Sequence, residues 1–102
     1  MSTINVSMPH NLKEDEALSR IKKLLNAVKN TYSESITNLI ENWVGNTCTF
    51  SFTAFGFEIT GTIIVNAKII NLNGEIPFLA FLLFEEAITS TINAEGKKLL
   101  ES

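Results

Sequence analysis

The sequence offers few side chains that could do chemistry, and none of them stands in a recognised catalytic pattern. It contains one histidine, His10, and one cysteine, Cys48. No motif supplies His10 with a nucleophile or a carboxylate partner, so we expect it to be solvated or to cap a helix. Cys48 lies on the apolar side of a predicted strand, where we expect a buried and inert thiol. One cysteine and one histidine cannot form a zinc site, and no glycine-rich phosphate loop is present. We therefore predict no metal, no cofactor and no enzymatic activity.

Two carboxylates could still form a binding site on neighbouring strands. If a two-residue turn at Asn66-Ala67 joins these strands, Glu58 lies directly opposite Glu75. Two opposed carboxylates could bind a cation or share a proton, although like charges in this position destabilise a sheet mildly. We favour the alternative in which both side chains splay into water.

Glu41 is a further candidate, and its role depends on strand register. A two-residue turn at Gly45-Asn46 pairs Glu41 with Phe50 and turns it to the apolar face beside Trp43, where it would be a polar anchor in a pocket. A shift by one residue moves Glu41 to the solvent face and places Ile36, Ile40 and Val44 on the apolar face instead. The alternation over residues 36–44 is mixed, and we favour the exposed Glu41.

These residues must be positioned by elements that the apolar pattern predicts. Residues 3–8 alternate between apolar and polar side chains, which is typical of a half-buried strand. Residues 12–30 carry one apolar stripe with helical spacing, and Asn11 with Glu14 resembles a capping box at the start of this helix.

From residue 36 the period of the pattern changes to two. The predicted strands are 36–44, 47–54, 57–65 and 68–76. Their short connections predict an antiparallel meander with one apolar face and one face rich in Thr and Asn. A second helix is predicted over residues 85–100, which Gly96 weakens by about 1 kcal/mol relative to Ala.

The order of these elements defines the fold class. It is α+β, in the order β-α-β-β-β-β-α, and one apolar sheet face must be covered by the two helices. We predict a curved antiparallel sheet with both helices on one face, a small helix-grip-like layout.

An apolar run separates the last predicted strand from the last helix. Residues 76–84 contain no charged or polar side chain. This domain's core, a second subunit, or an apolar ligand or surface must cover them. We expect most of the run to be core, with the remainder forming an exposed patch for dimerisation or for contact with an apolar surface. The residues predicted to make ligand or surface contacts are Trp43, Phe78, Phe81, Leu82 and Phe84.

The composition is that of one globular domain over residues 1–102. The chain is 45% hydrophobic and 19% charged, which excludes a disordered class. Its net charge of -3 argues against nucleic acid as a partner. The single cysteine and the absence of a signal-peptide pattern in residues 1–5 favour the cytoplasm. The apolar run is roughly half the length that a membrane-spanning helix needs, so no membrane span is predicted.

Several stretches, taken in order, resemble one known family. They are Ile4-Asn5-Val6, Pro9-His10, Trp43-Val44-Gly45-Asn46-Thr47, Thr49-Phe50-Ser51-Phe52, Gly56-Phe57-Glu58-Ile59-Thr60-Gly61-Thr62, Gly74-Glu75-Ile76-Pro77-Phe78 and Lys98-Leu99-Leu100. In this order they resemble the small bacterial polyhydroxyalkanoic acid system family, whose members are linked to polyester storage granules. The resemblance covers nearly the whole chain and consists mostly of turn glycines and alternating strands. The chain departs from the family pattern at Phe84-Glu85-Glu86-Ala87, where a basic, glycine-containing step is expected.

The resemblance implies a cytoplasmic, non-enzymatic protein that contacts a hydrophobic polymer or its coating proteins, and it supplies no catalytic residues. We therefore expect a small binding or accessory protein associated with polyhydroxyalkanoate granules or another apolar surface. The alternative is a carrier that holds a small apolar ligand between the sheet and the C-terminal helix. A homodimer that shares the apolar run is a further alternative for the partner.

Overall fold

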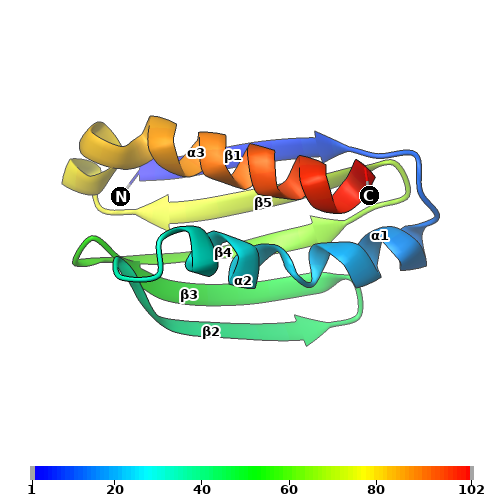
Figure 1. The fold of residues 1–102 in the computed structure, drawn as a ribbon, viewed down its shortest axis with the longest axis horizontal. Coiled ribbons are helices and arrows are strands. Elements are labelled where there is room, and N and C mark those ends of the chain that lie inside the picture. Colours follow the sequence, from blue (N-terminus) through cyan, green and yellow to red (C-terminus); the bar gives the residue numbers. More distant parts are fainter. Residues whose placement is uncertain (1, 102) are drawn as a thin grey trace.

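The computed structural model describes residues 2–101 and has the predicted order of elements (Figure 1). The elements are β1 (Ser2–Pro9), α1 (Glu14–Ile21), α2 (Leu24–Thr31), β2 (Ile36–Val44), β3 (Thr47–Ala54), β4 (Phe57–Val65), β5 (Ile69–Ile76) and α3 (Phe78–Glu101). The α+β class and the order β-α-β-β-β-β-α are confirmed, with α1 and α2 together taking the place of the first predicted helix.

The five strands form one antiparallel sheet in the order β1-β5-β4-β3-β2. Strands β2 to β5 form the predicted meander, and β1 completes the sheet by pairing with β5. The helices lie on one face of the sheet, with α3 running antiparallel to α1 and α2 (Figure 1). The opposite face carries the Thr- and Asn-rich side of the strands, and no helix within residues 2–101 lies on it.

The core lies between the inner sheet face and the apolar stripes of the helices. Alternate residues of β1, β3 and β5 are buried, as a sheet with one covered face requires. The largest fully buried side chains are Ile21, Leu24, Ile63, Ile70, Leu72, Ile76, Val65 and Cys48.

Two glycines allow unusually close packing around this core. A Cβ on Gly61 would overlap the backbone carbonyl oxygen of Asn73 and would lie 2.8 Å from Cζ of Phe50. A Cβ on Gly96 would meet the sulfur of Met8. The predicted weak point of α3 at Gly96 therefore lets the helix lie close over β1.

The first helical segment differs from its prediction in two respects. The N–H of Lys23 donates to the carbonyl of Arg20, three residues back, at 3.2 Å. This tighter turn interrupts the helix between α1 and α2. The predicted capping box is also wrong, because α1 begins at Glu14 and its N-cap residue is Lys13, which makes no side-chain cap bond.

Helix α3 begins at Phe78, seven residues before the predicted start at residue 85. The carbonyl of Pro77 accepts a hydrogen bond from the N–H of Phe81 at 3.0 Å. Proline is tolerated at the start of a helix because no helical partner exists there for the N–H that it lacks. Residues 76–84 are therefore the end of β5 and the first two turns of α3.

The turn between β4 and β5 is longer than predicted. Val65 pairs with Ile70, two residues beyond its predicted partner, and the whole register shifts with it. Glu75 consequently lies opposite Thr60, and the predicted direct pairing of Glu58 with Glu75 is wrong.

Strand β2 contains a bulge that explains its mixed pattern. Its register against β3 shifts between Thr37 and Ile40, and Asn38 has a positive φ of 57°. An extra residue at this point changes which alternate residues face inward. Ile36 before the bulge is buried, and Leu39 within it also packs against the core, whereas Ile40 after it is exposed.

Candidate functional site

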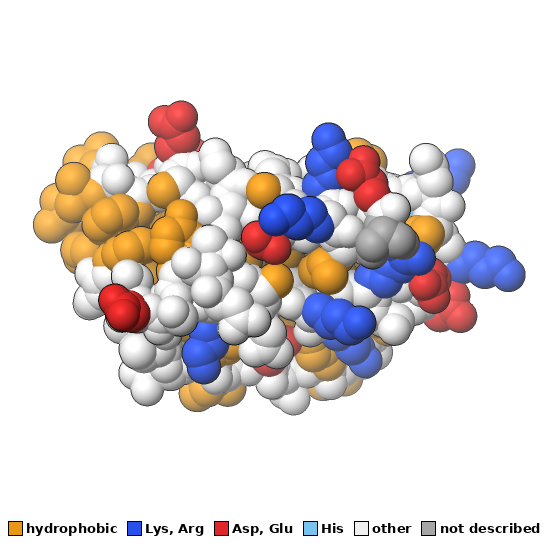
Figure 2. All heavy atoms as spheres, viewed as in Figure 1, with side chains coloured by type: hydrophobic (Ala, Val, Ile, Leu, Met, Phe, Trp, Pro, Cys, Tyr) orange, Lys and Arg blue, Asp and Glu red, His pale blue; other side chains and the backbone are white. Residues whose placement is uncertain are grey.

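An exposed apolar surface occupies the first two turns of α3. Phe78, Leu79, Leu82 and Leu83 are each between 56 and 63% exposed. Residues at this spacing share one side of a helix. Apolar side chains gather at the corresponding end of the molecule in Figure 2. We call these four residues the α3 patch.

The opposite side of the same two turns is anchored to the core. Ala80 is buried, and Phe81 packs against the core while partly exposed. The ring of Phe84 stacks on that of Phe55 in the turn between β3 and β4, with centroids 4.4 Å apart and an interplanar angle of 15°. The ring of Tyr32, which follows α2, also contacts Phe55 in an edge-to-face arrangement, with the two ring centroids 5.7 Å apart. These contacts hold the α3 patch on a fixed support.

The apolar run is therefore divided between core and surface. Ile76, Ala80, Phe81 and Phe84 contact the core as expected, whereas the four residues of the α3 patch do not. Two predicted contact residues, Phe78 and Leu82, belong to the patch, whereas Phe81 and Phe84 point toward the core. Leu79 and Leu83 were not predicted as contact residues. Extending the helical period of α3 back to Pro77 would have placed them beside Phe78 and Leu82.

The surroundings of the α3 patch are acidic. Glu75 lies shortly before α3, and Glu85 and Glu86 follow the patch directly. The Lys and Arg side chains on the helix side of the molecule lie mostly away from the patch (Figure 2). The patch is therefore suited to an uncharged or a basic surface and not to an acidic one.

Trp43 and Glu41 form a separate cluster on the inner face of β2. Nε1 of Trp43 donates a hydrogen bond to Oε1 of Glu41 at 3.1 Å, and Nζ of Lys22 lies 5.7 Å from the Trp43 ring centroid. Both β2 side chains are half-buried, so the favoured exposure of Glu41 is wrong. Ile36, at the other end of β2, is about 23 Å from Trp43 by strand length. The Phe84–Phe55 contact lies near the Ile36 end of β2, because the N–H of Phe55 donates a hydrogen bond to the carbonyl of Ser35. Trp43 is therefore not part of the α3 patch.

Cys48 is a buried, free thiol, as predicted. Burial raises its pKa, and the nearby Glu41 carboxylate raises it further, while a backbone hydrogen bond from Asn42 lowers it. A thiol that is fully buried and held in its neutral form is a poor nucleophile.

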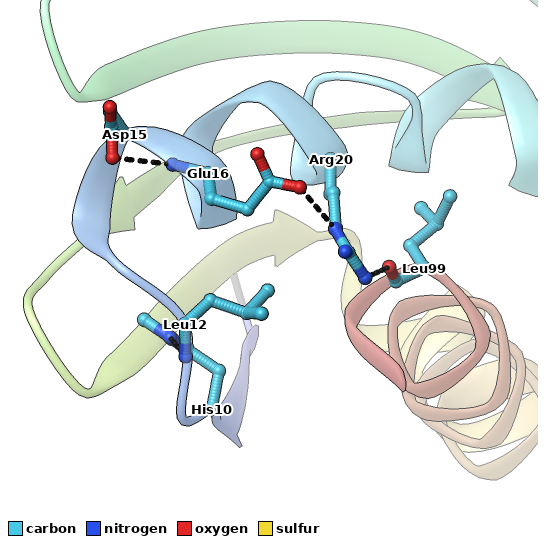
Figure 3. A network of polar contacts seen from close by, with 6 residues as sticks. All are labelled: His10, Leu12, Asp15, Glu16, Arg20 and Leu99. Carbon is cyan, nitrogen blue, oxygen red and sulfur yellow. Dashed lines mark hydrogen bonds and ion pairs between the residues drawn. The ribbon is translucent and has the colours of Figure 1, made fainter. Parts of the chain in front are cut away.

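His10 is buried at 7% exposure and links β1 to the start of α1 (Figure 3). Its Nδ1 accepts a hydrogen bond from the N–H of Leu12 at 3.2 Å, so Nε2 carries the proton that it donates to the carbonyl of Asn66 at 3.0 Å. The expected solvated position is wrong, and the imidazole instead satisfies two backbone groups. Figure 3 also shows Arg20 of α1, which bonds Glu16 at 2.9 Å and the carbonyl of Leu99 in α3 at 3.3 Å.

A small apolar cavity lies between the sheet and the helices. Its volume is about 30 Å³, and its lining includes Phe50, Phe52, Ile88 and Ile92. Sites for small organic ligands usually measure about 300 Å³ or more. The carrier alternative stays a prediction, and it would require α3 to move away from the sheet.

The family model described as "Putative polyhydroxyalkanoic acid system protein" matches residues 4–100. The chain belongs to this family. No protein with a curated description matches the chain. In this member of the polyhydroxyalkanoic acid system family, none of the helices within residues 2–101 is long and apolar enough to cross a membrane.

Proposed function

We propose that this chain is a non-enzymatic accessory protein of the polyhydroxyalkanoate system that adsorbs through the α3 patch to the neutral, apolar surface of the stored polyester. The proposal places it in the cytoplasm, at the storage granule. The single observation that carries it is the cluster of Phe78, Leu79, Leu82 and Leu83 left open on a rigidly anchored helix end. Membership of the family supports the choice of polymer.

The size of the α3 patch favours adsorption over self-association. Its four side chains together expose roughly 400 Å², within the range of the largest apolar patches on monomeric proteins. A stable protein interface of standard size buries about 800 Å² on each partner. A second copy docked on the patch alone would therefore make only a weak complex, whereas an extended polymer surface can bind many molecules side by side.

The charges around the patch favour an uncharged surface. Glu75, Glu85 and Glu86 would be repelled by the negative potential of an anionic lipid leaflet. A polyester carries ester groups without net charge, so its surface imposes no such repulsion. We therefore expect adsorption to polyester particles to exceed adsorption to vesicles of acidic phospholipid.

The energetic contribution of the patch sets the expected effect of mutation. Burying a leucine side chain completely contributes about 1.5–3 kcal/mol, and Leu82 and Leu83 are each a little over 60% exposed. Replacing both by serine should remove about 2–4 kcal/mol of adsorption free energy, which is a loss of at least about 30-fold in affinity. Folding should be unaffected, because both side chains already face solvent.

The decisive experiment measures adsorption of purified protein to polyhydroxybutyrate particles and to vesicles of neutral and of acidic phospholipid. The test variant is Leu82→Ser/Leu83→Ser. The matched control is Ile40→Ser/Val44→Ser, which removes two residues of similar exposure, 65% and 72%, from β2. The proposal predicts that the test variant loses adsorption and the control keeps it. Equal adsorption by the two variants, or preference for acidic vesicles, would refute it.

A further inference from the structure

The outer edge of β1 is open and regular. Strand order places β1 at one edge of the sheet, and its residues pair with β5 without interruption from Ser2 to Pro9. Proteins usually blunt such an edge with charges, bulges or prolines. Strand β2, at the other edge, carries a bulge, whereas β1 contains no charged residue and has its single proline at the last position.

The pairing pattern shows which backbone groups of β1 point outward. The N–H of His10 donates to the carbonyl of Lys68 in continuation of the β1–β5 register, at 2.9 Å. Because hydrogen-bonded and non-hydrogen-bonded positions alternate in an antiparallel pair, Thr3, Asn5 and Ser7 direct their N–H and C=O groups away from β5. Within residues 2–101, no backbone bond outside the sheet involves these three residues. They form a row of main-chain donors and acceptors complementary to another extended backbone.

A groove runs beside this edge. It lies between the end of β1 and the last turns of α3, has a volume of about 330 Å³, and is lined by residues that include Met8, Pro9, Asn93, Lys97 and Leu100. A side chain on the helix side of a strand added to β1 would project into this groove. The volume is ample for a large apolar side chain, since one water molecule occupies about 30 Å³ of liquid.

We propose that β1 accepts an extended peptide segment of a partner protein as a sixth strand of the sheet, with an apolar side chain of that segment in the groove beneath α3. Main-chain hydrogen bonds to Thr3, Asn5 and Ser7 supply the affinity, and the groove supplies the side-chain preference. This binding surface shares no residue with the α3 patch and does not depend on the proposed adsorption.

The position of α3 excludes a second copy of this chain as the occupant. Among the strands, α3 packs chiefly on β1, and it crosses over this strand in Figure 1. Pairing two β1 edges would place the strands about 4.8 Å apart, and the two helices above them would be at a similar separation. Packed helices need about 8–10 Å between their axes. A lone strand carries no helix and meets no such obstacle.

The test uses three blocked hexapeptides in which Thr alternates with Val, Leu or Phe, each added to the full chain at about 1 mM, and it follows amide hydrogen exchange by NMR. If at least one peptide binds with a Kd near 0.1 mM, exchange at Thr3, Asn5 and Ser7 should slow about tenfold. The matched peptide with N-methyl groups on its edge-facing residues cannot donate these hydrogen bonds and should slow nothing.

A pair of protein variants tests the same contact from the other side. Ser7→Pro removes one outward N–H and leaves the bonds to β5 in place, so it should abolish the slowing at Thr3 and Asn5. Ser7→Ala should retain it. Three results would each overturn the proposal: no slowing with any of the peptides, equal slowing with the N-methylated peptide, or peptide-induced changes confined to β2 or to the α3 patch.

Discussion

The replacement Gly61→Ala offers a sharp test of how β3 and β4 pack. Gly61 pairs with Phe50 on one side and with Gly74 on the other. A Cβ at position 61 would overlap the carbonyl oxygen of Asn73 and press on the Phe50 ring at 2.8 Å. The ring could rotate away, but the carbonyl belongs to the β4–β5 ladder and can move only with its strand.

The expected cost follows from these two contacts. Overpacking a core commonly costs about 1–3 kcal/mol, and a clash with backbone belongs at the upper end of that range. We therefore expect Gly61→Ala to lose about 3 kcal/mol of unfolding free energy, a large share of the 5–15 kcal/mol that is typical of a whole domain. With a urea m value of about 1.2 kcal/mol/M, the unfolding midpoint would fall by about 2.5 M.

Gly74→Ala provides the matched control. Gly74 is the direct cross-strand partner of Gly61, and neither glycine has a positive φ. A Cβ at position 74 meets only the carbonyl oxygen of Thr60, at an ordinary 3.8 Å. This variant should be neutral or stabilised by up to about 1 kcal/mol, because alanine restricts the unfolded chain. Similar urea midpoints for the two variants would refute the steric argument, since the positions differ chiefly in the space available to a Cβ.

Two further predictions concern the buried titratable side chains. His10→Ala should lower the free energy of unfolding in urea by about 2–4 kcal/mol, because it leaves the N–H of Leu12 and the carbonyl of Asn66 without their partner; a loss under about 1 kcal/mol would mean that water replaces the imidazole. Cys48, whose pKa is raised by burial, binds its proton more tightly in the folded state than in the unfolded state. Stability should therefore fall as the pH rises above the unfolded thiol pKa of about 8.5. Urea unfolding between about pH 8 and 10 should show this decrease relative to Cys48→Ala, and parallel curves for the two proteins would contradict it.

The sequence predicted the elements better than their connections. Alternation identified the strands because one sheet face is covered by helices and the other is open. In β3, for example, every second side chain is buried. The turn after β4 was misjudged because a two-residue and a four-residue connection keep the same parity of inward residues. The shift by two leaves every side chain on its predicted face but moves Glu75 from Glu58 to Thr60.

The orientation of Glu41 could not be predicted for a different reason. The two patterns weighed for residues 36–44 are both present, one before the bulge and one after it. Asn38 is the sequence signal of the bulge, since asparagine accepts a positive φ more readily than most residues. This signal is weak, because asparagine is also common in ordinary turns and on polar strand faces. Only two of the four residues of the α3 patch were predicted as contact residues. An unbroken apolar run has no period that separates a buried side of the helix from an exposed one.

The α3 patch and the groove lie at opposite ends of α3, and the β1 edge runs between these ends, from Thr3 opposite Glu75 to Ser7 beside the groove. The two proposed surfaces share no residue, which makes them independently testable. From Leu83 in the α3 patch to Lys97 at the groove is about 21 Å along the helix. No side chain of one surface lines the other. Leu82→Ser/Leu83→Ser should therefore abolish adsorption to polyester and leave peptide-induced protection of β1 intact, whereas Ser7→Pro should do the reverse. A protein adsorbed through the α3 patch still presents the groove, at the far end of α3, together with the Ser7 end of the β1 edge. It could therefore hold a partner's extended segment at the polymer surface. Loss of both properties in either variant would show that the two surfaces are coupled through the fold, and it would refute their independence.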